Sequence, residues 1–107
     1  MDAVNEYLKR TLNTMNLCGI IMQNNRPIMK CADGFEISVQ ASSTHYCSPR
    51  EDGDITYDAV ELGYPNREEP LIMDYAEDEG NYLHTVYGWV PIEIVNEMIK
   101  KHGGIIN

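Results

Sequence analysis

The stretch from Ser42 to Arg50 gathers hydroxyl groups, an imidazole, a phenol and a guanidinium within nine residues. Such side chains donate hydrogen bonds to phosphate and ribose oxygens, and their rings can stack on a nucleobase. The alternative interpretation is an ordinary polar loop held by serine and threonine turns. As a site, this stretch predicts ligand contacts from Thr44, His45, Tyr46, Ser48 and Arg50.

A second aromatic group follows later in the chain, where Tyr87 and Trp89 flank Gly88. Trp89 is the only tryptophan, and a tryptophan next to a helix is often a core anchor. The glycine, however, also allows a ligand or another backbone to approach closely. We therefore include Tyr87 and Trp89 among the candidate ligand-binding residues.

Together the two segments suggest a receptor for a small anionic ligand. Arg50, assisted by the hydroxyl groups of Thr44 and Ser48, would hold a phosphate. A base would lie between two rings, one from each segment, and stacking contributes about 1–3 kcal/mol per base. A cyclic homodimer would present both segments twice, about the same two-fold axis that a cyclic dinucleotide has.

Catalysis and metal binding are not indicated by the sequence. It contains no GxSxG, Walker, HExxH or EF-hand pattern. His45 and Cys47 could form a thiol–imidazole pair, but no third group that would orient the imidazole is evident. The three cysteines include no CxxC pair, and the three histidines show no metal-ligand spacing with them. We expect a protein that is not an enzyme and that has no metal or cofactor.

The charge of the chain is concentrated in its middle. The net charge is −9, and residues 51–79 hold eleven acidic residues and one basic residue, Arg67. No cluster of Lys and Arg indicates DNA or RNA binding. The acidic residues either form a solvated face or imitate a phosphate backbone for a basic groove on another protein. In the second case Glu68, Glu69, Glu77 and Asp78 are expected to carry the contact.

Periodicity in the first third of the chain predicts a helix and then a hairpin. Apolar residues at helical spacing indicate a helix over roughly residues 3–15. Two apolar runs, 17–22 and 28–32, are separated by a turn-forming segment at 23–27, which favours pairing of the two runs. Residues 33–34, Asp-Gly, predict a second tight turn.

The rest of the chain predicts short strands and a final helix. Alternation over 35–41 predicts a half-buried strand, and further strands are expected at 55–62, 71–73 and 85–90. A helix is expected at 91–102, because it has a proline at its start and two glycines after its end. We therefore predict a single α+β domain over residues 1–107. An N-terminal helix would precede an antiparallel sheet of four to six short strands, and a C-terminal helix would pack on this sheet.

Four strings in the chain, SVQASSTHYCSPR, VELGYP, PLIMDYAED and TVYGWVPIEIVNEMIKKHGG, span roughly residues 35–104. They resemble small acidic proteins encoded by phages and prophages, among them the immune-evasion sponges of anti-CBASS systems. This resemblance implies a homo-oligomer that sequesters a cyclic di- or oligonucleotide signal, such as a cGAMP-like molecule, without cleaving it. It also implies a location in the host cytoplasm. That location agrees with the absence of a signal-peptide core and of an apolar run near the roughly 20 residues that span a membrane.

The leading alternative is an acidic, protein-binding inhibitor of the anti-CRISPR kind. The two hypotheses differ in what they require of residues 44–50. The sponge hypothesis needs that stretch to be an ordered receptor beside a cavity, with Arg50 directed at the ligand. If the stretch is loose, lies away from any cavity and has Arg50 pointing into bulk water, the acidic segment becomes the better candidate.

Overall fold

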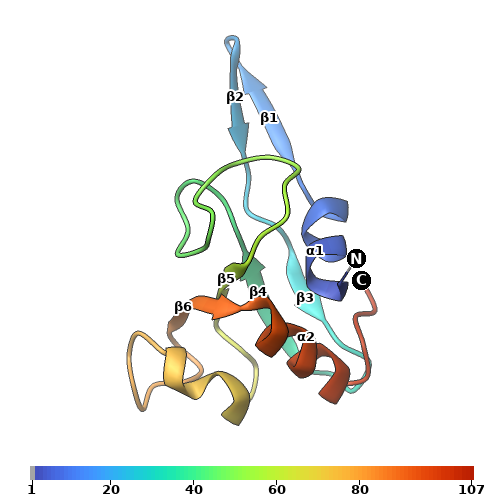
Figure 1. Ribbon diagram of the computed structural model, residues 1–107, viewed down its shortest axis with the longest axis vertical. Coiled ribbons are helices and arrows are strands. Elements are labelled where there is room, and N and C mark those ends of the chain that lie inside the picture. The colour runs from blue at the N-terminus through green and yellow to red at the C-terminus, as the bar shows by residue number, and fades with distance from the viewer. Residues whose placement is uncertain (1) are drawn as a thin grey trace.

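Two helices cover one face of a four-stranded antiparallel sheet, and a separate two-stranded hairpin projects from one end of the molecule (Figure 1). This computed structural model describes residues 2–107. The elements in chain order are α1 (Ala3–Arg10), β1 (Thr14–Leu17), β2 (Ile20–Gln23), β3 (Ile28–Lys30), β4 (Glu36–Gln40), β5 (Ala59–Gly63), the 3₁₀ helix η1 (Pro70–Tyr75), β6 (Val86–Pro91) and α2 (Ile92–Lys101). Within the sheet the strands follow the order β3-β4-β5-β6. The predicted α+β class, with six strands between an N-terminal and a C-terminal helix, is confirmed.

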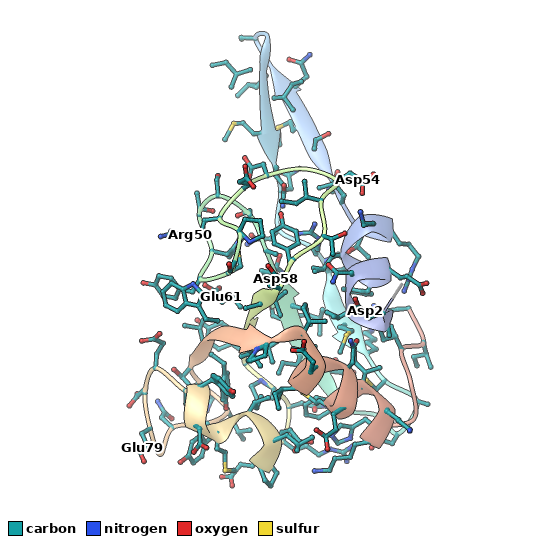
Figure 2. The ribbon with its side chains drawn as sticks, in the orientation of Figure 1. Asp2, Arg50, Asp54, Asp58, Glu61 and Glu79 are labelled. Carbon is teal, nitrogen blue, oxygen red and sulfur yellow. The ribbon has the colours of Figure 1, made fainter. Side chains whose placement is uncertain are left out.

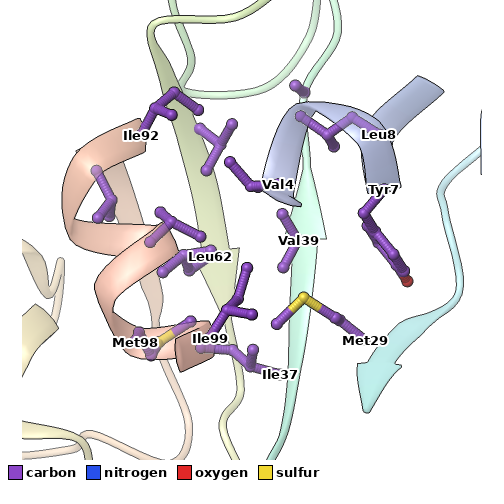
Figure 3. Close-up of a cluster of buried hydrophobic side chains, with 14 of the residues drawn as sticks. Val4, Tyr7, Leu8, Met29, Ile37, Val39, Leu62, Ile92, Met98 and Ile99 are labelled. Carbon is purple, nitrogen blue, oxygen red and sulfur yellow. The ribbon is translucent and has the colours of Figure 1, made fainter. Parts of the chain in front are cut away.

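The core lies between the helices and the sheet (Figure 3). The alternation over 35–41 places Phe35, Ile37, Val39 and Ala41 in this core, and all four are fully buried. From the helices, the core receives the side chains of Val4, Tyr7, Leu8, Val95, Met98 and Ile99. No helix among residues 2–107 has both the length and the apolar character needed to cross a membrane.

The first helix is shorter than the sequence predicts. Asp2 caps its start by accepting a hydrogen bond from the backbone N–H of Asn5 at 2.8 Å, and the helix ends at Arg10. Near this end the Thr11 hydroxyl donates to the Tyr7 carbonyl at 2.7 Å. Residues 14 and 15, expected at the end of the helix, instead belong to strand β1.

The first hairpin is also placed differently from the prediction. Strand β1 pairs with β2 across Cys18 and Gly19, which both have positive φ, at 52° and 85°. These are the dihedrals of the tight turns that suit two-residue hairpins. Strand β3 pairs instead with β4, and the turn predicted at 33–34 joins them, with Gly34 at φ 93°.

Two predicted strands need correction, whereas the final helix is confirmed. Residues 55–58 form no strand, because the Asn5 side chain bonds both the N–H and the carbonyl of Tyr57. Residues 71–73 lie in the 3₁₀ helix η1, which Glu69 caps through the Leu71 N–H at 3.0 Å. At the end of α2, the N–H of Gly104 reaches the Ile99 carbonyl at 3.0 Å in a left-handed conformation, as expected for a glycine C-cap.

Candidate functional site: an aromatic platform at the edge of the sheet

A bulge between β5 and β6 places Trp89 on the surface. Val60 pairs with Val90 and Leu62 with Tyr87, so Glu61 on β5 faces two residues of β6, Gly88 and Trp89. Trp89 has φ 49°, in the left-handed region that bulky residues rarely occupy. Its N–H donates to the Tyr46 carbonyl at 3.0 Å. The bulge therefore directs the backbone N–H of Trp89 toward the loop after β4, while β6 stays paired with β5 on both sides.

Three side chains meet at this point, and we call them the aromatic platform: Tyr46, Trp89 and Arg50. The rings of Tyr46 and Trp89 stack with centroids 4.9 Å apart and an interplanar angle of 22°. Both rings remain partly open to solvent, with Tyr46 40% and Trp89 47% exposed. The Arg50 guanidinium lies 5.9 Å from the Tyr46 ring centroid and extends outward at the edge of the molecule (Figure 2).

The loop that supplies Tyr46 is held firmly by hydrogen bonds. The Tyr46 N–H donates to a Glu61 carboxylate oxygen at 3.0 Å. The Ser48 N–H donates to the Ala59 carbonyl at 3.0 Å, and the Asp58 N–H donates to the Ser48 carbonyl at 2.7 Å. This loop is therefore an ordered element fastened to β5, as a preformed receptor requires.

Two of the other predicted ligand contacts are engaged within the loop itself. The Ser42 hydroxyl bonds His45 Nδ1 at 2.6 Å and the Thr44 hydroxyl at 3.1 Å. Burial lowers the pKa of His45 below its ordinary value, so the ring is neutral at pH 7. His45 therefore supplies no positive charge to a phosphate.

Cys47 lies in the same loop but does not pair with His45. Its thiol donates to the Ser42 carbonyl at 3.1 Å, and burial raises the pKa of the thiol. A thiol in this environment is a poor nucleophile, because the reactive form is the thiolate.

The expected sandwich of a base between Tyr46 and either Tyr87 or Trp89 is not compatible with this arrangement. Tyr87 is fully buried and its hydroxyl donates to the Tyr82 carbonyl at 2.6 Å, so it is a core residue and not a ligand contact. Tyr46 and Trp89 already touch, whereas an intervening base would need roughly 7 Å between the rings, two contact distances of about 3.5 Å. Within residues 2–107 no pocket is formed.

Acidic side chains of residues 51–79 lie on several sides of the molecule, with Glu61 beside the platform and Asp54 next to α1 (Figure 2). Of the eleven acidic residues between 51 and 79, nine are exposed, Glu61 is half-buried and Glu69 is buried. Glu77 lies close to the platform, since one of its carboxylate oxygens is 3.1 Å from the position of a Cβ built on Gly88. Of these nine exposed acids in residues 51–79, only Asp54 forms an ion pair within residues 2–107, with Lys9 at 3.3 Å. The exposed surface of this segment is therefore strongly negative.

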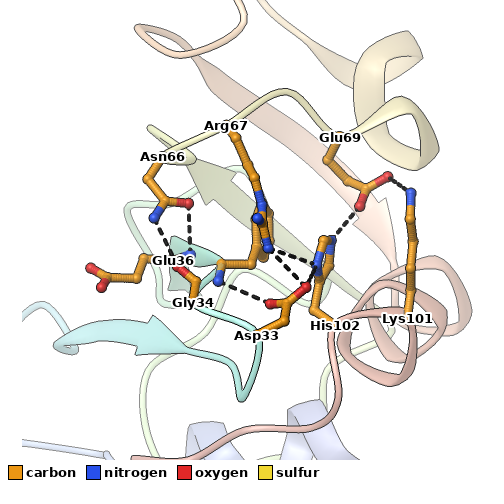
Figure 4. A network of polar contacts seen from close by, with 9 residues as sticks. Asp33, Gly34, Glu36, Asn66, Arg67, Glu69, Lys101 and His102 are labelled. Atoms are coloured by element: carbon orange, nitrogen blue, oxygen red, sulfur yellow. Dashed lines mark hydrogen bonds and ion pairs between the residues drawn. The ribbon is translucent and has the colours of Figure 1, made fainter.

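Glu69 belongs to a polar network that the sequence did not predict (Figure 4). His102 lies between two carboxylates, with Nδ1 2.6 Å from Asp33 and Nε2 2.6 Å from Glu69. Lys101 also binds Glu69, and Arg67 binds Asp33, each at 2.8 Å. The hydrogen bond from His102 is the main cause that lowers the pKa of Asp33. Because these groups satisfy one another, the network ties α2 to two loops and stabilises the fold.

Comparisons with known proteins give no further guide to function. No protein-family model, curated protein or solved structure matches the chain. The resemblance to phage-encoded sponges therefore stays a prediction, and only the residues described above bear on what the protein binds.

Proposed function

We propose that this protein is a non-catalytic inhibitor that inserts its aromatic platform and acidic surface into a basic, nucleic-acid-binding groove on another protein. The environment of Trp89 is the observation that carries this proposal. The residue is half-exposed, its backbone is in the left-handed region, and the carboxylates of Glu61 and Glu77 lie beside the platform. Strained residues of this kind cluster at binding sites.

The chemistry of the platform suits a cationic partner. The face of an indole ring attracts Lys and Arg side chains by about 0.5–1 kcal/mol when exposed and about 2 kcal/mol when desolvated. Tryptophan and tyrosine are also among the residues that most often dominate binding energy at protein interfaces. The exposed acids, nine in residues 51–79, would steer a basic surface toward the platform. A groove that binds DNA or RNA offers such a surface, and the predicted resemblance to phage proteins implies a target in the host cytoplasm.

Sequestration of a cyclic nucleotide is the second candidate, and Arg50 is the observation that favours it. Its guanidinium stands beside the stacked rings, where it could hold a phosphate while a base stacks on the free face of Trp89. This arrangement gives one open surface, so the remaining walls of a binding site would have to come from another subunit. The carboxylates of Glu61 and Glu77 oppose a phosphate, and for this reason we rank the nucleotide second.

Titration calorimetry with an arginine-rich peptide tests the first proposal. We expect affinity that falls steeply as salt rises, because exposed charges are screened over about 8 Å at physiological salt. Trp89→Asn should weaken binding by about tenfold or more. Asparagine tolerates positive φ, so this variant should keep the fold, as circular dichroism can verify.

Matched charge variants distinguish binding at the platform from general electrostatic attraction between the acidic protein and the basic peptide. Glu61→Gln with Glu77→Gln removes two charges beside the platform, and Glu93→Gln with Glu97→Gln removes two from α2. The first pair should weaken peptide binding severalfold and the second should leave it within about twofold. Equal effects of the two pairs, or a peptide affinity unchanged in Trp89→Asn, would reject the platform as the binding surface. A panel of cyclic di- and trinucleotides, with Arg50→Ala as the sensitive variant, tests the second candidate.

A further inference from the structure

The hairpin of β1 and β2, which we call the arm, projects from the body of the molecule (Figure 1). Its register pairs Met15 with Met22 and Leu17 with Ile20. Residues that pair directly, and residues two apart on one strand, point to the same face. One face of the arm therefore consists of Met15, Leu17, Ile20 and Met22, and all four side chains are exposed.

The base of the arm is fixed to the body, so the apolar face is held in a defined direction. The Gln23 side chain donates to the Ala41 carbonyl at 2.9 Å and accepts from the Gly53 N–H at 3.0 Å. Asn24 and Asn13 close the hairpin below the paired strands with a bond of 2.8 Å. An isolated two-stranded hairpin is marginally stable in water, and an exposed apolar face normally marks an interaction site.

We propose that the apolar face of the arm packs against the same face of a second copy of this chain, forming a two-fold symmetric dimer. The arm is the part of the molecule where charge least opposes the approach of a second copy. Residues 11–25 contain no charged side chain, whereas the whole chain carries −9. Two copies repel each other through their acidic bodies, and the arm is the uncharged place where they can meet. A strand of four residues extends about 13 Å, which exceeds the screening length of about 8 Å at physiological salt.

The area of the face fits a reversible dimer. The four side chains are 45–65% exposed, so each arm offers on the order of 400 Å² and two arms together bury on the order of 800 Å². Stable specific interfaces begin at about 1,200 Å². The arms alone should therefore give a dimer that dissociates on dilution, and this dimer does not depend on what the aromatic platform binds.

Sedimentation equilibrium from about 1 µM to about 1 mM protein, a range that brackets a micromolar dissociation constant, tests this inference. The wild-type chain should shift from monomer to dimer across the range, and Ile20→Lys should stay monomeric throughout. Ile106→Lys is the matched control, because Ile106 is 66% exposed, close to the 65% of Ile20, and receives the same added charge. It should dimerise like the wild type. A wild-type chain that remains monomeric, or an Ile20→Lys variant that dimerises normally, would overturn the proposal.

A second measurement does not depend on any substitution. The methyl resonances of Met15 and Met22 should move with protein concentration, since both side chains lie on the apolar face. Those of Met73 and Met98 should not move, because Met98 is buried in the core and Met73 lies in η1. Concentration-dependent shifts at Met73 or Met98 alone would place the contact elsewhere and contradict the arm.

Discussion

Replacing Glu69 by Gln tests the network that anchors α2. Glu69 is 1% exposed and accepts three hydrogen bonds, from His102, Lys101 and the Leu71 N–H. Glutamine keeps one oxygen, which can still accept from His102 Nε2. The other oxygen becomes an NH₂ group, so the acceptor for Lys101 and Leu71 is lost.

The expected loss of stability follows from those two hydrogen bonds. A neutral hydrogen bond contributes about 0.5–1.5 kcal/mol and one to a charged group about 1.5–3 kcal/mol. The Lys101 side chain is 47% exposed, so solvent screening reduces its share to about 1 kcal/mol. With the Leu71 N–H left facing a donor, we expect Glu69→Gln to lower the free energy of unfolding by about 2–3 kcal/mol. For a domain of this size that corresponds to a fall in Tm of about 10 °C.

Urea denaturation of Glu69→Gln against Glu68→Gln measures this difference. Glu68 is the exposed neighbour and undergoes the same chemical change, so its variant should match the wild type within about 0.5 kcal/mol. Equal midpoints for the two variants would refute the role of the network.

The difference in unfolding free energy between wild type and Glu69→Gln should also depend on pH, in a direction that follows from the pKa of Glu69. Burial raises the pKa of Glu69, but the hydrogen bonds from Lys101, Leu71 and His102 outweigh it, so the pKa lies below its ordinary 4.5. The carboxylate therefore contributes stability that is fully present above pH 4.5 and is lost as the pH falls through the folded-state pKa. The gap between wild type and Glu69→Gln should shrink over that range, and a gap that widens in acid would contradict the assignment.

Two further substitutions test the aromatic platform and the contact of Arg26 with the end of α1. Gly88→Ala should cost about 1 kcal/mol and change Trp89 fluorescence, because the new Cβ would lie 3.3 Å from Tyr46 Cβ. Gly63→Ala, whose Cβ meets nothing nearer than 3.5 Å, should be nearly neutral in the same urea titration. Arg26→Lys should cost about 2 kcal/mol, because the buried guanidinium donates to the Leu8 and Ala41 carbonyls at 3.0 and 2.8 Å. Exposed Arg10→Lys is its control, and thermal melts in which these two variants coincide would contradict this role.

The sequence predicted the elements that are specified by residues close together in the chain. Strand β4 follows from strict alternation, and α2 follows from its glycine cap. The arm was missed because the helical spacing of apolar residues continues to residue 15, and because Cys18 is an unusual residue for a left-handed turn position. The His102 network could not be predicted, since Asp33 and His102 lie 69 positions apart.

The candidate site was predicted in part. Tyr46, Arg50 and Trp89 do meet, although they come from a loop and a strand that are distant in sequence. The exposure of Trp89 depends on the bulge opposite Glu61, and a bulge leaves no clear pattern in a single sequence. Burial of Tyr87 depends on the same feature, because the bulge changes which side chains of β6 face outward.

The most direct test of the proposed binding surface is the indole N–H resonance of Trp89, which is unique because the chain has one tryptophan. In a titration of ¹⁵N-labelled protein with an arginine-rich peptide, we predict a saturable shift of this resonance, together with the amides of Tyr46 and Glu77, that high salt reverses. Cyclic dinucleotides should leave it in place. An indole resonance that does not shift with the peptide, or that shifts with the nucleotides instead, would contradict the proposal that the platform binds a basic partner.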